Sequence, residues 1–373
     1  MSGAAPPRLL VSAGEPSGDR LAAEVVTEVR CRHPDVVVEG IAGPRMREAG
    51  VVPLGNADSL ATMGFQEVLG AIPRHFRLLQ ALVARARSPG FQAALLVDYP
   101  GFHLRLGARL RAAGVPVIQY VAPQLWAWRP GRLPALRRAA DLVAGVLPFE
   151  PRWFAERGVD CRYVGHPAVD RKRPTREAAR ARLGIGQADV ILGIFPGSRE
   201  REIGYNWPLF RDVGRRMLAG GWCARVVVAG TSGGYYPESA PFQLQRDTPE
   251  DVLAASDAVL VKSGTATLEA ALAGVPMAVA YRTARFTYEV ARRVMTVDRI
   301  SLVNLIAGED VVPEFWHPPV SAAPVGDAVR ALLEQGSPAA ARQRAGLAVV
   351  RERLGGPGAA GHVAALVVER LGC

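Results

Sequence analysis

A single aspartate, Asp98, follows the apolar run Leu95-Leu96-Val97 and precedes the turn-forming tripeptide Tyr99-Pro100-Gly101. We expect the apolar run to be a buried strand that ends at Asp98. A carboxylate at the carboxyl end of such a strand, in a cleft, is a candidate general base. The alternative is that Asp98 caps a helix that starts near Phe102.

A second group of polar residues follows the apolar run Leu9-Leu10-Val11 near the amino terminus. Glycines in this loop allow tight or positive-φ turns, and a serine or an aspartate can cap a helix that begins near Arg20. Free N–H groups at the start of that helix favour anions or hydroxyl-rich ligands, whereas the plainer interpretation is an ordinary capped turn. The candidate residues of the loop are Gly14, Glu15, Ser17, Gly18 and Asp19.

The segment from Gly193 to Ile203, "GIFPGSREREI", has the composition of an anion site. We expect a strand to end at Phe195, Pro196-Gly197 to turn the chain, and a helix to follow Ser198. Exposed N–H groups, a hydroxyl and the guanidinium of Arg199 would then converge, as binding of a diphosphate requires. The alternative is a capping box between Ser198 and Arg201 or Glu202.

A third polar loop, Ser263-Gly264-Thr265, follows a predicted strand in "VKSGTATLEAALAGVPMAVAYR". Small residues let a ligand approach the backbone. Glu269, placed early in the next helix, could accept hydrogen bonds from both hydroxyls of a ribose. A plain helix cap would explain Ser263 or Thr265 but not the whole set.

These loops belong to two series of alternating strands and helices, which predict right-handed βαβ units and parallel sheets. Two doubly wound, Rossmann-like sheets in succession make a cleft between domains the expected ligand site. We place the domains at residues 8–166 and 167–338, followed by a helical segment, 339–373, broken at Gly355–Gly361. The predicted strands cover 9–11, 36–41, 93–97, 117–121, 142–147, 190–195, 225–229, 258–261 and 276–281, and the predicted helices 20–30, 73–87, 104–113, 211–219, 249–255, 267–273 and 287–294.

The composition of the chain disfavours some classes of function. The formal charge is +10, but nearly all basic residues are arginine, and no basic cluster is interleaved with aromatics as in nucleic-acid modules. Four scattered cysteines and the absence of a long apolar stretch favour a cytoplasmic protein that does not cross a membrane. D-x-D does not occur, so we expect no metal, and no G-x-G-x-x-G follows a predicted strand, so we expect no dinucleotide cofactor.

Nine motifs in order resemble those of the lipid-A-disaccharide synthase family. They are "SAGEPSGD", "MGFQEVL", "VDYPGFHLRL", "APQLWAWRPGR", "LPFE", "YVGHP", "PGSREREI", "SGTATLEAAL" and "VPEF", between Ser12 and Phe315. The resemblance implies two Rossmann-like domains of GT-B type facing across a cleft. It also implies inverting transfer of 2,3-diacylglucosamine from its UDP conjugate to the 6-hydroxyl of 2,3-diacylglucosamine 1-phosphate, which yields the β-1,6-linked disaccharide and UDP.

The resemblance also assigns roles to the candidate residues. Asp98 would take the proton of the acceptor hydroxyl, and the helix near Ser198 would stabilise the departing diphosphate together with Arg199. Glu202 would be a further substrate-binding residue. The uridine and ribose would be held by Ser263, Gly264, Thr265, Thr267 and Glu269, with Asn304 at a nucleotide-contacting position. The loop Gly14–Asp19 would form a substrate wall. Three departures are His103, where many relatives have asparagine, Val303, where proline is common, and a shortened stretch between Gly230 and Thr248.

A further segment carries apolar residues at helical spacing ahead of Arg74 and Arg77. An apolar face beside cations is typical of a helix at an anionic membrane, so we expect peripheral attachment to the inner face of the inner membrane. The alternative is that the same face is ordinary core. The expected acyl-chain contacts are Met63, Phe65, Val68, Leu69 and Ile72.

Two other functions stay open at this point. One is a different UDP-sugar transferase or a UDP-sugar epimerase on the same scaffold. The other is a non-catalytic binder of membrane surfaces, which the joint presence of Asp98, Arg199 and Glu269 disfavours. The expected partners are the two lipid substrates, an anionic membrane surface and, as an open alternative, a second copy of the chain.

Overall fold

The computed structural model describes residues 5–56, 78–86, 90–128 and 130–372. The chain forms two compact units. The first unit comprises Met1–Asp170 and Gly356–Cys373, and the second comprises Arg171–Gly355. The chain therefore crosses between units after Asp170 and again after Gly355, whereas we expected boundaries at 166/167 and 338/339. The second difference arises because residues 338–354 form a helix that packs within the second unit.

The first unit is built on a parallel sheet with the strand order β3-β2-β1-β4-β5-β6-β7. Its central strands are buried and hydrophobic, as expected for a parallel sheet that is covered on both faces. Ser12 pairs with Leu96, and Leu96 pairs with Gln119, so the carboxyl ends of β1, β4 and β5 lie at one edge. The strands are β1 Arg8–Ala13, β2 Val37–Ala42, β3 Val52–Asn56, β4 Ala93–Val97, β5 Val117–Tyr120, β6 Leu142–Gly145 and β7 Cys161–Tyr163.

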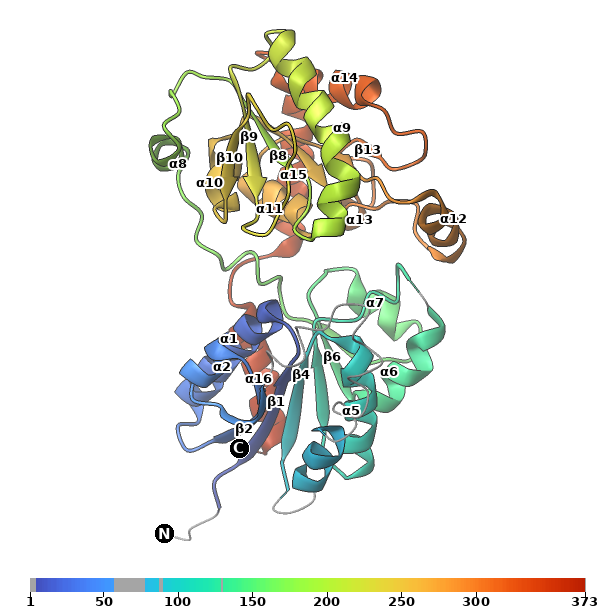
Figure 1. Ribbon diagram of the computed structural model, residues 1–373. Helices are drawn as coiled ribbons and strands as arrows, with labels where there is room; N and C mark the ends of the chain where they lie inside the picture. The colour runs from blue at the N-terminus through green and yellow to red at the C-terminus, as the bar shows by residue number, and fades with distance from the viewer. Residues whose placement is uncertain (1–4, 57–77, 87–89, 129, 373) are drawn as a thin grey trace. The chain divides into compact units, whose positions relative to one another are not determined.

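Helices cover the first sheet, and one of them comes from the far end of the chain. The last helix, α16, packs against α1 and β4, and Figure 1 shows it beside α1. Part of the predicted carboxyl-terminal segment thus returns to the first unit. The helices are α1 Pro16–Arg32, α2 Pro44–Glu48, a helix described over 78–86, α5 Pro100–Ala112, the 3₁₀ turn η1 Pro130–Arg132, α6 Leu133–Ala139, α7 Glu150–Ala155 and α16 Ala359–Leu371.

The second unit is also built on a parallel sheet, in the order β10-β9-β8-β11-β12-β13. The strands are β8 Ile191–Phe195, β9 Arg225–Gly230, β10 Gln243–Arg246, β11 Ala258–Lys262, β12 Met277–Ala280 and β13 Glu314–Phe315. The helices are α8 Arg176–Leu183, α9 Glu200–Ala219, α10 Pro249–Ala255, α11 Thr265–Ala273, α12 Arg285–Val294, α13 Leu302–Ala307, α14 Ala322–Leu333 and α15 Pro338–Leu354.

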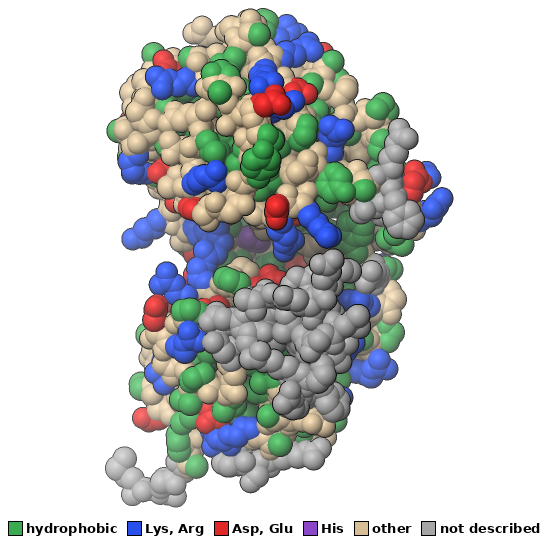
Figure 2. All heavy atoms as spheres, in the orientation of Figure 1, with side chains coloured by type: hydrophobic (Ala, Val, Ile, Leu, Met, Phe, Trp, Pro, Cys, Tyr) green, Lys and Arg blue, Asp and Glu red, His purple; other side chains and the backbone are tan. Residues whose placement is uncertain are grey.

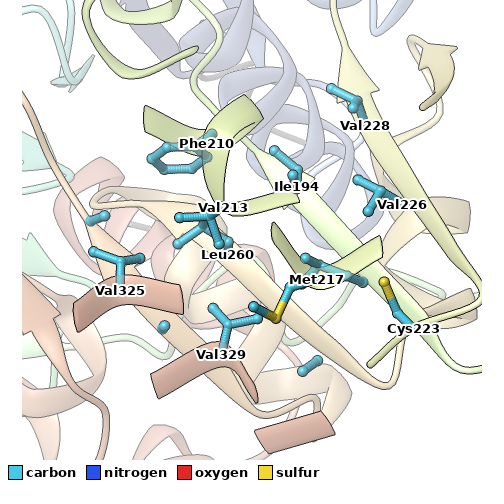
Figure 3. Close-up of a cluster of buried hydrophobic side chains, with 14 of the residues drawn as sticks. Ile194, Phe210, Val213, Met217, Cys223, Val226, Val228, Leu260, Val325 and Val329 are labelled. Carbon is cyan, nitrogen blue, oxygen red and sulfur yellow. The ribbon is translucent and has the colours of Figure 1, made fainter. Parts of the chain in front are cut away.

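The core of the second unit lies where α9 and α14 meet the sheet. Phe210, Val213 and Met217 recur along α9 at helical spacing and are fully buried against Ile194 and Leu260 of the strands (Figure 3). Burial of such side chains contributes about 1.5–3 kcal/mol each. This packing fixes the start of α9, and with it the loop that follows β8.

The predicted alternation of strands and helices in both halves is confirmed, but several boundaries are not. α1 begins at Pro16 instead of Arg20, because proline is favourable at the first helical position. α9 begins at Glu200 instead of Arg211, since the helix continues through Pro208. The short strands β3, β7, β10 and β13 were not predicted, and the ends of both sheets are formed by them.

The distribution of charged side chains and the apolarity of the helices both bear on function. On the face that Figure 2 shows, Lys and Arg side chains are interspersed with acidic and hydrophobic ones in both units. None of the helices within the described residues has the length and apolarity needed to span a bilayer.

Candidate functional site

The loop after β1 is shorter than the sequence suggests. Only Gly14 and Glu15 separate β1 from α1, and Glu15 is the N-cap residue without a side-chain cap bond. Ser17, Gly18 and Asp19 lie in the first turn of the helix, so neither Ser17 nor Asp19 caps it, contrary to our expectation. Ser17 is exposed and Glu15 is half-buried, so these two side chains remain available to a ligand at this edge.

Asp19 holds a second helix in place. Its side chain is buried and accepts hydrogen bonds from the backbone N–H groups of Gly43, Arg45 and Met46, at 2.8, 2.9 and 3.2 Å. These groups are the otherwise unpaired donors at the start of α2. The predicted placement of Asp19 on a substrate wall therefore needs correction, because both carboxylate oxygens are engaged within the first unit.

Asp98 lies directly after β4, as predicted, and the backbone there is unusual. Asp98 and Tyr99 have φ values of 53° and 49°, in the left-handed region that favours glycine. The helix α5 starts at Pro100 with Tyr99 as its N-cap residue, so the alternative in which Asp98 caps a helix near Phe102 is not observed. The Asp98 side chain is half-buried at the carboxyl edge of the sheet.

The aromatic ring of Tyr99 covers the loop after β1. A Cβ atom on Gly14 would lie 2.5 Å from two ring atoms of Tyr99, so only glycine permits this contact. Burial raises the pKa of the Tyr99 hydroxyl, and the charge of Glu15 adds to the effect. The loops after β1 and β4, which the sequence singled out separately, are therefore in direct contact.

The His103 side chain links β1 to the residue that follows β4. Its Nδ1 lies 2.6 Å from the Asp98 carbonyl oxygen, and its Nε2 lies 2.9 Å from the Ser12 hydroxyl. The side chain is completely buried, and burial lowers the pKa of His103 to about 4. His103 is therefore a neutral, hydrogen-bonding side chain at neutral pH.

The tryptophan-containing segment packs within the first unit. Trp126 is buried and donates a hydrogen bond from Nε1 to Glu150, which also accepts from the N–H groups of Val146 and Leu147. Burial raises the pKa of Glu150 to about 7. Trp126 therefore packs inside the first unit, whereas Trp128 is 40% exposed.

The second unit contains a pocket of about 250 Å³ at the carboxyl ends of β8, β9 and β11. Two of the predicted loops contribute to it, as the doubly wound topology requires. Gly197 has a φ of 130°, and a Cβ atom there would lie 2.9 Å from the Cβ of Glu202, so the turn after β8 requires glycine. The predicted residues that line the pocket are Ser198, Glu202, Gly264, Thr265 and Glu269.

Sequence reasoning missed Lys262, the last residue of β11. Among the described residues that line the pocket it carries the only positive charge, and its Nζ lies 3.1 Å from Glu202 Oε1. Burial alone would raise the pKa of Glu202, but the charge and hydrogen bond of Lys262, the Ser198 N–H and Arg199 together lower it. Lys262 is one of only two lysines in a chain rich in arginine, which was the available signal.

Glu269 lies on the second turn of α11 and has a partner. Its Oε1 is 2.5 Å from Nη1 of Arg171, and its side chain is 30% exposed. A ligand that approaches Glu269 therefore meets a carboxylate already oriented by a cation. The shortened stretch between Gly230 and Thr248 also contributes, since Thr231 and Asp247 line the pocket.

Four predicted ligand contacts are not among the described lining residues of the pocket. Arg199, the N-cap residue of α9, is 76% exposed and lies 3.8 Å from Glu202. Ser263 donates to the Ile300 carbonyl, and Thr267 is fully buried and donates to the Gly264 carbonyl. Neither Ser263 nor Thr265 caps α11, whose N-cap residue is Gly264.

Asn304 requires the clearest correction. It is 1% exposed, and its amide nitrogen donates to the Val312 carbonyl and to Glu314. Its amide oxygen accepts from the N–H groups of Val311 and Val312, both at 2.9 Å. All of its hydrogen-bonding capacity is used inside the second unit, so it orders the segment before β13 instead of contacting a nucleotide.

Some predictions lie outside the described residues. These are the acyl-chain contacts Met63, Phe65, Val68, Leu69 and Ile72 with the neighbouring Arg74 and Arg77. Within the part of the chain that the structure describes, no group of three or more His, Cys, Asp and Glu side chains is arranged to hold a metal ion.

Comparison with known proteins shows the family of the chain. Residues 9–354 match the family model described as lipid-A-disaccharide synthetase. A lipid-A-disaccharide synthase of Myxococcus xanthus is 40% identical over 377 residues, which cover 98% of both chains. Two solved structures share the fold at low identity. Arabidopsis thaliana UGT89C1 in complex with UDP has a TM-score of 0.64 at 13% identity, covering 99% of this chain and 100% of that one. A putative UDP-N-acetylglucosamine 2-epimerase from Listeria monocytogenes has a TM-score of 0.66 at 12% identity, covering 99% and 97%.

Proposed function

The chain belongs to the lipid-A-disaccharide synthetase family and is a hexosyltransferase, and from this premise we propose the reaction that it catalyses. It transfers 2,3-diacylglucosamine from UDP-2,3-diacylglucosamine to the 6-hydroxyl of 2,3-diacylglucosamine 1-phosphate. The products are UDP and the β-1,6-linked disaccharide 1-phosphate, and the configuration at the anomeric carbon is inverted. The observation that carries the proposal is the family match over residues 9–354, which include both Asp98 and the pocket of the second unit.

The pocket of the second unit binds the UDP part of the donor. Its position at the carboxyl ends of parallel strands supports this assignment. Thr265 and Glu269 offer hydrogen-bonding groups to the ribose and uracil. Lys262 offers an ammonium group to the diphosphate from the end of β11, and Arg199 offers an exposed guanidinium from the start of α9.

The diphosphate gains negative charge as the bond between the anomeric carbon and its oxygen breaks. Cationic groups that are already in place at that oxygen stabilise the transition state more than the ground state. Arg199 and Lys262 supply this compensation in our proposal, which uses no metal ion. Glu202, the present partner of Lys262, holds the lysine side chain in the pocket until the diphosphate arrives.

Asp98 acts as the general base of the reaction. Its carboxylate accepts the proton of the acceptor 6-hydroxyl while that oxygen forms a bond to the anomeric carbon. The bond to the diphosphate oxygen breaks on the opposite face, UDP leaves, and the configuration inverts. The position of Asp98 at the carboxyl edge of the sheet supports the role, because ligands of doubly wound sheets bind there.

The acyl chains place the reaction at a membrane. We propose that the protein works in the cytoplasm, attached peripherally to the inner face of the inner membrane. The apolar and basic residues between Met63 and Arg77 carry this part of the proposal on their sequence pattern alone.

The test is product analysis with purified protein in detergent. Both substrates are mixed with the wild type or with Asp98→Asn, and the disaccharide 1-phosphate is sought by mass spectrometry, with its anomeric configuration determined by NMR. Glu156→Gln, an exposed carboxylate paired with Arg152, is the matched control. We expect product from the wild type and the control only. Epimerised UDP-sugar, or UDP released without the lipid acceptor, would instead favour the epimerase or another transferase.

A further inference from the structure

Two consecutive non-glycine residues, Asp98 and Tyr99, adopt the left-handed conformation at the end of β4. Each such residue costs on the order of 1–3 kcal/mol and persists only where the surroundings enforce it. The surroundings must therefore hold these two residues in place. The peptide group that joins them is the central element, because its orientation determines where the Asp98 side chain points.

Three hydrogen bonds hold the backbone of Asp98. Its N–H donates to the Tyr120 carbonyl at 2.9 Å, which continues the pairing with β5. Its carbonyl oxygen accepts two bonds, from His103 Nδ1 at 2.6 Å and from Gln119 Nε2 at 3.2 Å. Because both lone pairs of the carbonyl are engaged, the peptide plane after Asp98 is fixed against rotation.

The proton on His103 is located by its partners. A carbonyl oxygen can only accept, so Nδ1 must carry the hydrogen and donate it to Asp98. Nε2 is then an acceptor, and the Ser12 hydroxyl donates to it at 2.9 Å. Complete burial lowers the pKa of the ring to about 4, so this single tautomer is the neutral form present at physiological pH. Ser12 is itself fully buried within β1, so the hydroxyl group that donates to His103 is held rigidly.

We propose that His103 is a positioning residue, whose Nδ1–H bond to the Asp98 carbonyl aims the Asp98 carboxylate at the acceptor hydroxyl. The inference rests on the proposed role of Asp98 as the base. His103 does not touch the reacting atoms and does not exchange a proton. Its effect is on the rate of the chemical step, because a displacement of about 1 Å in a catalytic group can reduce a rate about 100-fold.

Two substitutions separate the two hydrogen bonds of His103. In His103→Asn the amide nitrogen lies as many bonds from the backbone as Nδ1 does, so the donor to Asp98 is kept while the reach to Ser12 is lost. In His103→Gln the side-chain amide lies at the distance of Nε2, so contact with Ser12 is kept while no donor occupies the Nδ1 position. His103→Leu removes both.

The experiment measures kcat and KM for both substrates, thermal stability, and hydrogen exchange of the peptide that contains residues 98–103. We expect His103→Asn to keep kcat within about threefold of the wild type, and His103→Gln and His103→Leu to lose about 100-fold. The KM values should stay within about twofold, because the inference concerns a group that is aligned for chemistry and not one that binds substrate. Faster exchange in His103→Gln than in His103→Asn is expected as well.

Equal kcat values for His103→Asn and His103→Gln would overturn the inference, even if His103→Leu fails to fold. Asp98→Asn, assayed alongside, separates this failure from failure of the proposed function. Loss of activity in Asp98→Asn with wild-type rates in every histidine variant would remove only the positioning role. A wild-type rate in Asp98→Asn would remove the base assignment itself, and with it the inference.

Discussion

The two candidate sites hold their key groups by different means. In the first unit, the backbone of Asp98 is fixed by neutral hydrogen bonds from the completely buried His103 and the buried Gln119. In the second unit, Lys262 is held by an ion pair with Glu202, and the two side chains are 19% and 18% exposed. A buried neutral network leaves no alternative partner, whereas a charge at the wall of a pocket can exchange one anion for another. The site proposed for proton transfer thus has a fixed geometry. The site proposed for diphosphate binding has a cation that can exchange its partner.

The comparison predicts the largest loss of kcat for substitution of Asp98. Asp98→Asn should lower kcat by about 10²- to 10⁴-fold, the usual contribution of a general base, with KM values little changed. Steady-state kinetics with both substrates measure this, with Glu156→Gln as the matched control. An unchanged kcat with a higher KM would instead show that Asp98 contributes to substrate binding.

The rigidity of the first site should also appear in its dependence on pH. The pKa of His103 is lowered from 6.5 to about 4 by burial, so between these values the unfolded chain takes up a proton that the folded chain does not. The unfolding free energy should therefore fall as the pH drops from about 6.5 to about 4, by up to about 3 kcal/mol. Urea denaturation at pH 7 and pH 4.5 should show a smaller fall in His103→Asn than in the wild type. An identical fall in both proteins would show that His103 is not held neutral.

The exchangeable charge of the second site predicts a binding defect. Lys262→Met should weaken binding of UDP, and raise KM for the donor, by about 10- to 100-fold, the worth of a hydrogen bond to a charged group. Calorimetric titration of UDP measures the affinity directly. Lys172→Met, which removes the only other lysine of the chain from an exposed position, is the control and should bind as the wild type does.

The turn after β8 predicts the smallest effect. Gly197→Ala places a Cβ atom 2.9 Å from that of Glu202 at a φ of 130°, so it should weaken UDP binding by about tenfold. Gly204→Ala, within α9 and with no neighbouring atom outside the helix backbone within 4 Å of the new Cβ, should bind UDP normally and stabilise α9 by about 1 kcal/mol. Equal affinities in the two variants would show that the turn tolerates a side chain.

The two sites also differ in how much of them the sequence predicts. The pocket of the second unit is formed by segments that each follow a strand, so strand prediction and parallel topology were enough to bring Ser198, Gly264 and Glu269 together. In the first unit the same reasoning placed Asp98 correctly at the end of β4. The fold follows from the alternation of buried runs and helical patterns for the same reason, since that pattern is local in the sequence.

Side-chain partners are what the sequence could not predict. Ser12 and His103 are 91 positions apart, and the pairing of Asp19 with the start of α2 depends on how two helices pack. Asn304 looks like a polar ligand group in the sequence, but the loop before β13 uses every one of its hydrogen-bonding atoms. Each of these is set by tertiary packing, which no local pattern specifies.

The two variants Asp98→Asn and Lys262→Met test most directly whether one site transfers the proton and the other binds the diphosphate. UDP is titrated into each variant, and the turnover of each is measured at saturating substrates. The account predicts that Asp98→Asn binds UDP within about twofold of the wild type yet forms almost no disaccharide, because a base acts on the acceptor alone. It predicts that Lys262→Met binds UDP at least about tenfold more weakly. Weakened UDP binding in Asp98→Asn, or unchanged binding in Lys262→Met, would contradict the account.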